Sequence, residues 1–471
     1  MRMNNDSILV IGAGTWGCSI ALDLARNGYS NVTVLDREEV PSTIAAGNDL
    51  NKIMEEGSQS EDDTDASYAW NRLHALCTKA WLEDPVYKPF YHRTGYVMAA
   101  SSDPAYSALL EDIKGQEDEY QRISSPEEFR STMPKGVLTG DFEGWRGFAK
   151  QTGAGWVYAR GAITAVKLEA ERLGAHFIVG QKGEVVQLVF SENTRSETMQ
   201  SEKGDAPRTL HAIKTADGTL HRAHTTILAN GANADCLLNF KGQLRPTAWT
   251  LAHIQMTPSE AELYKNFPVL FNIERGFFME PSAESHELKI CDEHPGYINP
   301  VYSNDHSEMT EGGNQNYGGN NRRIVGSRPF SKHQIPIESE ARVRSFLRET
   351  MPHIAERPFS FARICWDADT PDRMPLVDWY PHSCPGRRNF LLAVGGSGHS
   401  FKTMPAMGQV VREFLEGRVD ERTRRAFRWR PETAVDRDWW DVQDRWGADG
   451  KVMDFNDVKG WTGIGESRRS E

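Results

Sequence analysis

The first 36 residues carry the pattern that most constrains the fold. The stretch SILVIGAG predicts a short apolar strand from Ile8 to Ile11. TWGCSIALDLARNGY then predicts a helix whose apolar residues recur at helical spacing and which stops at Gly28. A second strand, NVTVLD, ends at Asp36. Because a G-x-G-x-x-G loop joins the first strand to the helix, this order predicts a dinucleotide-binding βαβ unit.

The three glycines and the acid of this unit each have a physical purpose. Gly12 permits the tight turn, Gly14 lets the backbone approach a pyrophosphate, and Gly17 lets the helix pack closely on the strand. The helix N-terminus offers unpaired N–H groups to the phosphates. Asp36 stands where a carboxylate can bind both ribose hydroxyls. The motif alone leaves NAD and FAD equally open.

Later segments predict further strands of the same sheet. One helix of about 15 residues precedes a strand at Phe177–Val179. A hairpin turning at Asp217-Gly218 leads into a buried strand at Thr226–Ala229. NFLLAVGGSGHSFKTMPAMGQVVREFLEG is a second strand, glycine loop and helix, with Gly395, Gly396 and Gly398 in the loop. Since the two strand–glycine–helix units are far apart in the chain, we expect one nucleotide domain interrupted by another.

The interruption spans residues 236–354, where TAWTLAHIQM, VLFNIERGFFMEP and HELKICDEHPG predict strands of a mixed sheet. Residues 303–323 are polar and rich in Asn and Gly, which is typical of a mobile insertion. Residues 55–67 predict a second surface loop.

Composition limits the class of protein. The chain has 471 residues, enough for two or three cores, and its net charge of −12 argues against a general nucleic-acid binder. Neither the N-terminal MRMNNDS nor any later segment has the apolar run of a signal peptide or of a membrane-spanning helix, and SRRSE is not a peroxisomal tripeptide. We therefore expect a cytoplasmic protein with no membrane partner. Nothing in the sequence demands an oligomer, so a monomer is expected.

The cysteines stand far apart. Because no CxxC occurs, neither a zinc site nor a disulfide framework is indicated, and a small buried side chain is the ordinary interpretation of each cysteine. Cys365, in FARICWDADTPDRMPLVD, stands alone ahead of an acidic turn. The six are Cys18, Cys77, Cys236, Cys291, Cys365 and Cys384.

Two lysines are candidates for chemistry. In ELKICDEHPG, alternation places Lys289, Cys291 and Glu293 on one strand face, with Lys289 and Glu293 about 13 Å apart, which suits opposite ends of one pocket. The alternative is an edge strand with solvated charges. Lys402 lies in the second glycine loop, where a cation near a helix N-terminus is disfavoured unless an anion or carbonyl is near. An exposed lysine is the alternative there.

The chain resembles the fungal fructosyl amino acid oxidases (amadoriases) of the monomeric sarcosine oxidase family. The likeness is carried by GAGTWGCSIALDLARNGYSNVTVLD, PSTIAAGNDLNKIM, GAGWVYAR, QLRPTAWTLAHIQ, ELKICDEHPGY, FARICWDADTPDR and WRPETAVDRDW. The resemblance implies an α/β fold, in which a Rossmann-like FAD-binding domain of the glutathione-reductase type is interleaved with an α+β substrate domain on a mixed β-sheet. The implied bounds are 1–85, 146–235 and 355–425 for the FAD-binding domain, 86–145 and 236–354 for the substrate domain, and 426–471 for a tail that folds back over the active site.

The resemblance also assigns residues. It implies that Cys365 is joined through sulfur to the 8α-methyl of FAD, which needs one thiol and no partner. It places Lys52 and Lys289 near flavin N5, where a cation stabilises the charge formed when O2 is reduced. For substrate it implies Glu293 and Lys402 at the sugar and amine, Arg445 at the carboxylate, and Trp249 as an apolar wall. The other implied FAD contacts are Gly12, Gly14, Thr15, Trp16, Gly17, Asp36, Ser42, Asn48, Gly396, Gly398 and Lys402.

The activity implied is FAD-dependent oxidation of Amadori products. The sugar C1–N bond is oxidised, the imine is hydrolysed to glucosone and a free amino acid, and O2 leaves as H2O2. Glycated amino acids and O2 are the implied small-molecule partners. Another secondary amine oxidase, acting on sarcosine, pipecolate or saccharopine, is the nearest alternative. The glycine motif alone permits a nicotinamide-dependent dehydrogenase, but Cys365 and the two lysines argue against it. A non-catalytic flavin-binding protein stays open, as does the choice between α- and ε-fructosyl amino acids.

Overall fold

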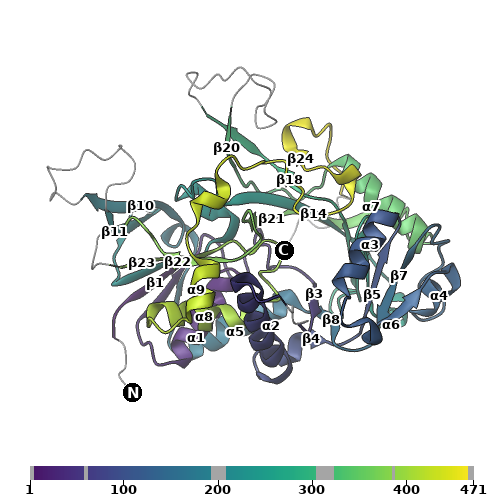
Figure 1. Ribbon diagram of the computed structural model, residues 1–471, viewed down its shortest axis with the longest axis horizontal. Helices are drawn as coiled ribbons and strands as arrows, with labels where there is room; N and C mark the ends of the chain where they lie inside the picture. The colour runs from purple at the N-terminus through teal and green to yellow at the C-terminus, as the bar shows by residue number, and fades with distance from the viewer. Residues whose placement is uncertain (1–4, 58–61, 193–207, 304–322, 384–387, 465–471) are drawn as a thin grey trace.

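Two sheets organise the structure, a computed structural model that describes residues 5–57, 62–192, 208–303, 323–383 and 388–464. Within these residues one sheet has six strands and the other has ten. They lie in opposite halves of an elongated molecule (Figure 1). The predicted 303–323 insertion falls almost entirely outside the described residues.

The six-stranded sheet has the order β22-β23-β13-β1-β2-β9. Neighbouring strands are parallel except the edge pair of β22 and β23, which is antiparallel. The strands are β1 (Ile8–Ile11), β2 (Val32–Leu35), β9 (His176–Ile178), β13 (Thr225–Leu228), β22 (Leu376–Trp379) and β23 (Phe390–Val394).

Both faces of this sheet are covered. Val10 and Val34 face a core formed with the helices, whereas Leu9, Ile11 and Leu35 face the opposite core. Alternate residues of a strand point to opposite faces, so an apolar run such as ILVI suits a sheet buried on both sides. The helices are α1 (Thr15–Arg26), α2 (Asp65–Glu83), α5 (Ala159–Arg172) and α8 (Met404–Leu415). The opposite face meets the antiparallel strands β10 (Val185–Glu192), β11 (Arg208–Thr215) and β12 (Leu220–His221).

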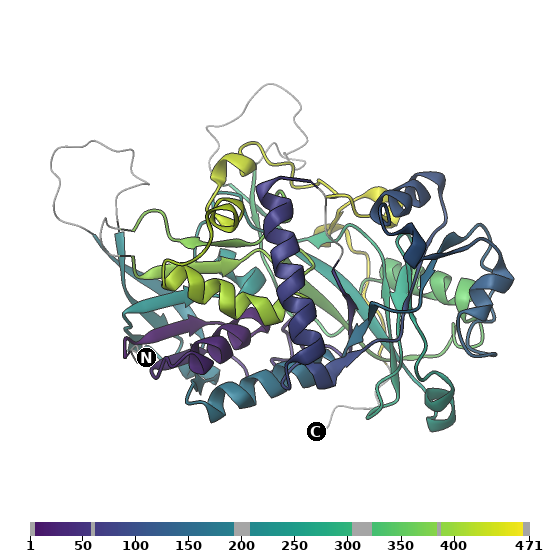
Figure 2. The ribbon, with the colours of Figure 1, turned by 60° about the horizontal axis from the view of Figure 1, so that its bottom comes forward.

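The two strand–glycine–helix units form one sheet, as predicted, because β13 joins β1 to β23. Their helices also touch. The Ser19 hydroxyl of α1 donates to the Met404 carbonyl at 2.5 Å and accepts the Gly408 N–H at 3.1 Å, both in α8. A Cβ on Gly408 would lie 2.4 Å from the Ser19 carbonyl oxygen, so the close helix packing requires glycine there. Figure 2 shows α2 crossing the middle of the molecule beside α8.

The ten-stranded sheet is mixed and has the order β24-β18-β14-β17-β16-β15-β5-β7-β6, with β21 also paired to β14. Parallel pairs join β15 to β5 and β18 to β24. Its strands are β5 (Tyr96–Ala100), β6 (Gln121–Ile123), β7 (Arg146–Lys150), β14 (Arg245–Gln255), β15 (Val269–Asn272), β16 (Gly276–Phe278), β17 (Glu287–Asp292), β18 (Tyr297–Ile298), β21 (Phe359–Asp369) and β24 (Met453–Asp454).

Helices α3 (Asp103–Asp112), α4 (Pro126–Ser131), α6 (Pro258–Leu263) and α7 (Ile337–Thr350) lie in the half of the ten-stranded sheet (Figure 1). Leu288 and Ile290 pack with Phe346 of α7, which fixes the face that β17 turns to the core. Lys289 and Cys291 therefore point to the other face. The remaining strands and α-helix are β3 (Lys52–Glu55), β4 (Tyr91–His92), β8 (Ala154–Val157), β19 (Pro300–Tyr302), β20 (Ile324–Ser327) and α9 (Glu421–Phe427).

Some sequence-based predictions need correction. The strands predicted at 177–179 and 226–229 each begin and end one residue earlier. The surface loop predicted at 55–67 is shorter in the structure, because Glu55 belongs to β3 and α2 begins at Asp65. Residues 58–61 lie outside the described residues. An edge strand with solvated charges is wrong for β17, since β17 lies between β14 and β16. The domain bounds stay a prediction; β21, assigned to the FAD-binding segment 355–425, pairs with β14 of segment 236–354.

Candidate functional site

A cavity of about 930 Å³ lies at the carboxyl ends of the parallel strands. This is where open α/β sheets bind their ligands. Predicted cofactor residues meet there from both halves of the interrupted domain. The predicted residues that line it are Gly12, Gly14, Thr15, Trp16, Asp36, Ser42 and Gly396.

The glycine loop has the geometry that the sequence predicts. Gly12 has φ +99°, and a Cβ there would lie 2.6 Å from the Asn230 Cα. A Cβ on Gly17 would lie 1.8 Å from the Gly12 carbonyl oxygen, so Gly17 allows the helix to approach the strand. Nothing lies within 4 Å of a Cβ placed on Gly14, which lines the cavity. The loop therefore leaves room for a pyrophosphate against its backbone.

Two polar groups at this cavity also fit a dinucleotide. Asp36 accepts the N–H groups of Ala13 at 2.7 Å and Glu38 at 3.2 Å, and burial raises the pKa of its carboxyl. Asn230 lines the cavity, and its buried Oδ1 has no hydrogen-bond partner among the described residues. A buried oxygen without a donor is costly, so a ligand N–H or O–H suits this place. The cavity thus fits the adenosine and pyrophosphate parts of FAD.

The loop at residues 41–49 closes one side of the cavity. The Asn48 amide donates to the carbonyls of Pro41 and Ser42, and the Ser42 hydroxyl donates to Glu38 at 2.8 Å. The guanidinium of Arg363 on β21 donates to the Thr43, Ala45 and Asn48 carbonyls at 3.2, 3.0 and 2.6 Å. Three charge-assisted hydrogen bonds from one buried side chain fix the loop to β21.

Cys365 lies two residues after this arginine on the same face of β21. It pairs across the strands with Trp249 and is 8% exposed. Its Sγ lies 4.0 Å from the carbonyl oxygen of Ala46, a residue that lines the cavity. The lone thiol therefore stands behind the wall of the cavity, at the Ala46 position.

Lys52 and Lys289, the two lysines predicted to lie near the flavin, meet although they come from distant segments. Lys52 Nζ lies 2.8 Å and Lys289 Nζ 2.7 Å from the same oxygen, Oδ2 of Asp49. Lys289 also donates to the Asn51 carbonyl at 2.8 Å and is 2% exposed. Burial acts to raise the pKa of Asp49, but Lys289, Lys52 and Arg363 hold it well below its ordinary value. The carboxylate is thus ionised between two ammonium groups.

The predicted substrate residues form a second charged group. Arg445 donates through both Nη atoms to Asp369, each at 2.8 Å, and its guanidinium lies over the Trp249 ring at 4.6 Å. Glu293 follows β17 directly. Burial raises the pKa of Glu293 to about 8, and Arg445 opposes this rise. Trp249, Glu293 and Arg445 are therefore neighbours, while Arg445 already has a carboxylate partner within the chain.

The second glycine loop contributes Gly396, Gly398 and Lys402. The Gly398 N–H donates to the Asp367 carboxylate, which lines the cavity. The Lys402 carbonyl accepts the Trp81 indole N–H at 3.1 Å, which anchors the loop to α2. His399 accepts from Arg373 at 3.1 Å, and burial with the nearby cations of Lys402 and Arg373 lowers its pKa well below the ordinary value.

Several of these partners were not predicted from the sequence. Asp49 stands three residues before Lys52 in GNDLNK, so its i, i+3 spacing was a usable signal. Arg363, Cys365, Asp367 and Asp369 follow one another at intervals of two residues, and on a strand this spacing places them on one face. No pattern within the sequence joins these residues to Lys289 or Arg445.

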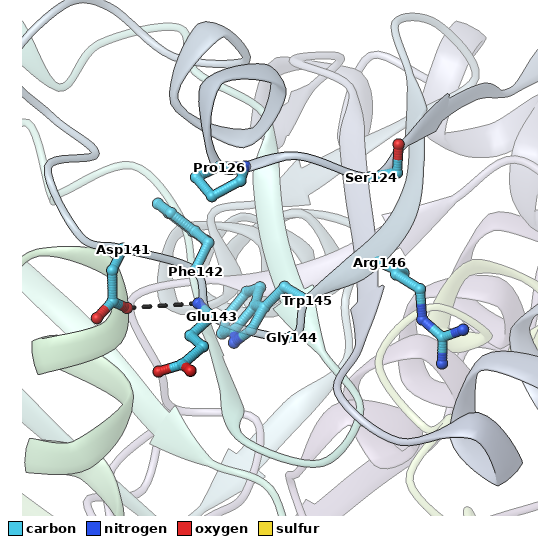
Figure 3. A pocket seen from close by; sticks show the side chains of 8 residues that line it. All are labelled: Ser124, Pro126, Asp141, Phe142, Glu143, Gly144, Trp145 and Arg146. Atoms are coloured by element: carbon cyan, nitrogen blue, oxygen red, sulfur yellow. Dashed lines mark hydrogen bonds between the residues drawn. The ribbon is translucent and has the colours of Figure 1, made fainter.

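A second hollow, of about 620 Å³, lies in the half of the ten-stranded sheet. Figure 3 shows Arg146 pointing away from Asp141 and Glu143, and Phe142 and Trp145 are buried at 1% and 2% exposure. The charged groups thus do not converge. No metal-binding group of His, Cys, Asp or Glu occurs in the described part of the chain, and no described helix is long and apolar enough to cross a membrane.

Comparisons with known proteins identify the family of the chain. Residues 7–414 match the family described as FAD dependent oxidoreductase (DAO). The chain is 48% identical to the solved fructosyl amine:oxygen oxidoreductase (amadoriase I) of Aspergillus fumigatus, over 99% of both chains with a TM-score of 0.85. It is 44% identical to the deglycating fructosamine oxidase (amadoriase II) of that fungus, over 98% of both chains with a TM-score of 0.87. It is also 27% identical to L-saccharopine oxidase of Schizosaccharomyces pombe, over 96% of this chain and 98% of that protein.

Proposed function

The chain belongs to the family of FAD-dependent oxidoreductases, and we propose that it oxidises Amadori products, the fructosyl adducts of amino acids. The observation that carries the proposal is the 48% identity, over 99% of both chains, to a fructosyl amine:oxygen oxidoreductase. The 27% identity to L-saccharopine oxidase makes another secondary amine the runner-up substrate.

The proposed reaction needs only the substrate, water and O2, with FAD as the electron carrier. The sugar C1–N single bond loses two electrons and two protons and becomes an imine. Water adds to the imine and releases glucosone and the free amino acid. FAD, when bound, takes up the two electrons and passes them to O2, which leaves as H2O2.

The residues of this chain bind and orient the reactants. Arg445 and Trp249 receive the amino acid end, where a guanidinium can donate to a carboxylate and the indole supplies an apolar wall. Glu293 and Lys402 receive the sugar and the secondary amine. Lys52 and Lys289 present positive charge where O2 is reduced. The roles of Lys52, Lys289 and Arg445 are supported by the geometry of two charged groups near one cavity, the Asp49 group and the Asp369 group.

The cofactor is held by the glycine loop, Asp36 and the 41–49 loop. Cys365 supplies the thiol for an 8α-S-cysteinyl bond, which its place behind Ala46 supports. The protein acts as a cytoplasmic monomer on small glycated molecules, with no nucleic-acid or membrane partner.

A peroxide assay on the purified protein tests the function. We expect a yellow protein that produces H2O2 with fructosyl-valine or fructosyl-lysine and not with sarcosine or saccharopine. As a matched pair, Arg445→Ala should raise KM for the substrate, whereas Arg172→Ala, which removes a surface arginine paired with Glu169, should leave KM unchanged. Turnover of saccharopine with no turnover of fructosyl amino acids would refute the proposal.

A further inference from the structure

Asp49 is the only described residue whose carboxylate contacts both Lys52 and Lys289. Its Oδ2 forms ion pairs with both ammonium groups, and its Oδ1 accepts the Leu50 N–H at 2.9 Å. The Asp49 and Lys289 side chains are 1% and 2% exposed, whereas that of Lys52 is 25% exposed. The carboxylate is therefore a buried junction between β17 and the segment that enters β3.

The junction is rigid on each side. Lys289 is held by β17 and by its hydrogen bond to the Asn51 carbonyl. The Asp49 carbonyl accepts the Arg160 N–H at 3.0 Å, and Arg363 donates to the Asn48 carbonyl. The Lys289 ammonium and the backbone at Asp49 are thus fixed by contacts that do not involve the carboxylate itself.

Two ammonium groups this close repel each other, and in a buried place each loses hydration. A shared carboxylate offsets both effects. Burial acts to lower the pKa of Lys52, but Asp49 raises it above the ordinary value. The other polar groups that face the junction are Arg363 and Cys365 of β21 and Cys291 of β17, with His253 opposite Lys289 on β14. Asp49 is the one carboxylate among these groups, and Glu287 of β17 pairs with His253 at 3.5 Å.

We propose that Asp49 is the positioning residue of the site: it holds Lys52 and Lys289 at one point and keeps both ammonium groups charged. The inference rests on the proposed function only for what the charges then do, namely favour the reduction of O2. The geometry of the junction stands apart from that reaction.

The protonation of Lys52 can be measured directly, because this lysine is partly exposed and amines react with acetic anhydride only when they are deprotonated. Competitive acetylation across a pH series, followed by mass spectrometry, gives the pH of half-labelling. In Asp49→Asn we expect this pH for Lys52 to fall by about one to three units, the size of a lost opposite charge. An unchanged labelling pH would overturn the proposal.

Two further variants sharpen the labelling test. In Lys289→Met, Asp49 has Lys52 alone as its lysine partner, so the labelling pH of Lys52 should stay or rise; a fall would overturn the proposal even if Asp49→Asn does not fold. Asp292→Asn is the matched control, because Asp292 is equally buried but pairs with Arg342. It should lower stability and leave Lys52 labelling unchanged. A fall equal to that of Asp49→Asn would mean a general effect of a lost buried carboxylate.

A kinetic arm separates this inference from the proposed function. In Asp49→Asn, the reaction of the reduced holoenzyme with O2 should slow at least tenfold, and reduction by substrate should change less. In a variant that already carries Lys52→Met and Lys289→Met, adding Asp49→Asn should slow the reaction with O2 no further, because Asp49 acts through the two lysines. A labelling shift with an unchanged O2 rate would leave the Asp49 junction standing and refute the lysines' part in oxidation.

Discussion

Replacing Asp369 by Asn tests how the C-terminal tail is fixed to the site. Asp369 is completely buried and receives both Nη atoms of Arg445, while Arg245 reaches it at 3.3 Å. Asn keeps the shape and one acceptor oxygen but turns an amide N–H₂ toward a guanidinium. Removing one member of a buried ion pair costs about 3–5 kcal/mol, since the remaining charge stays buried without its partner.

The cost should appear as local opening of the tail. Arg245 also donates to the Trp439 and Asp441 carbonyls, so the same group of charges holds residues 439–445. Since each 1.4 kcal/mol is a factor of ten, we expect amide exchange in this segment to accelerate by about two to three and a half powers of ten. Hydrogen-exchange mass spectrometry on peptides covering 439–446 measures it.

Lowering the pH gives a second test, because the pKa of Asp369 fixes the direction in which stability changes. Burial acts to raise the pKa of Asp369, but Arg445 and Arg245 hold it well below its ordinary value. Its stabilisation is therefore present above about pH 4 and lost as the pH falls through the folded-state pKa. The difference between wild type and variant should shrink in acid. Asp23→Asn, which breaks the Asp23–Arg412 pair of α1 and α8, should leave tail exchange unchanged. Equal exchange in wild type and Asp369→Asn at pH 7 would refute the reasoning.

Three further predictions concern single residues. Acid precipitation should leave flavin in the pellet of the wild type and release it from Cys365→Ser; flavin set free from the wild type would exclude the thioether. Lys289→Met should slow reoxidation by O2 much more than reduction by substrate in rapid-mixing experiments, and equal slowing would indicate a structural role. Glu293 has its pKa raised to about 8 by burial, so the folded state binds this proton more tightly than the unfolded state. Wild-type melting temperature should therefore fall between about pH 4.5 and 8 relative to Glu293→Gln, and parallel melting curves would contradict the burial of this carboxyl.

Local patterns in the sequence predicted the nucleotide-binding half well. The residues from Ile8 to Asp36 form β1, α1 and β2 as expected, because strand, loop and helix each have their own periodicity within a few residues. The second glycine loop was found in the same way. Strand bounds were wrong by single residues where the hydrogen-bond register, rather than the composition, decides the end of a strand.

Contacts between distant residues could not be predicted. Lys289 and Asp49 are separated by 240 residues, and Arg445 and Asp369 by 76. Alternation on β17 placed Lys289 and Cys291 on one face, but nothing local says which face another segment will cover. Lys52 and Lys289 were brought to the same place only by the family resemblance. The carboxylate between them follows from the structure alone.

One face of β21 explains why these contacts coincide. Arg363, Cys365, Asp367 and Asp369 alternate along the strand and so share a face. They contact, in turn, the 43–48 loop, Ala46, the Gly398 N–H and Arg445. Between them, Ile364, Trp366 and Ala368 pack into the opposite core. A slip of β21 by one residue against β14 would exchange these faces, turning these four side chains into the apolar core and removing all four contacts at once. The irregularity in this pairing lies between His253 and Ile254, opposite the start of β21 and away from Cys365, so the register is regular from Arg363 to Asp369. The loop, the thiol, the second glycine loop and the tail are therefore positioned by the register of one strand pair.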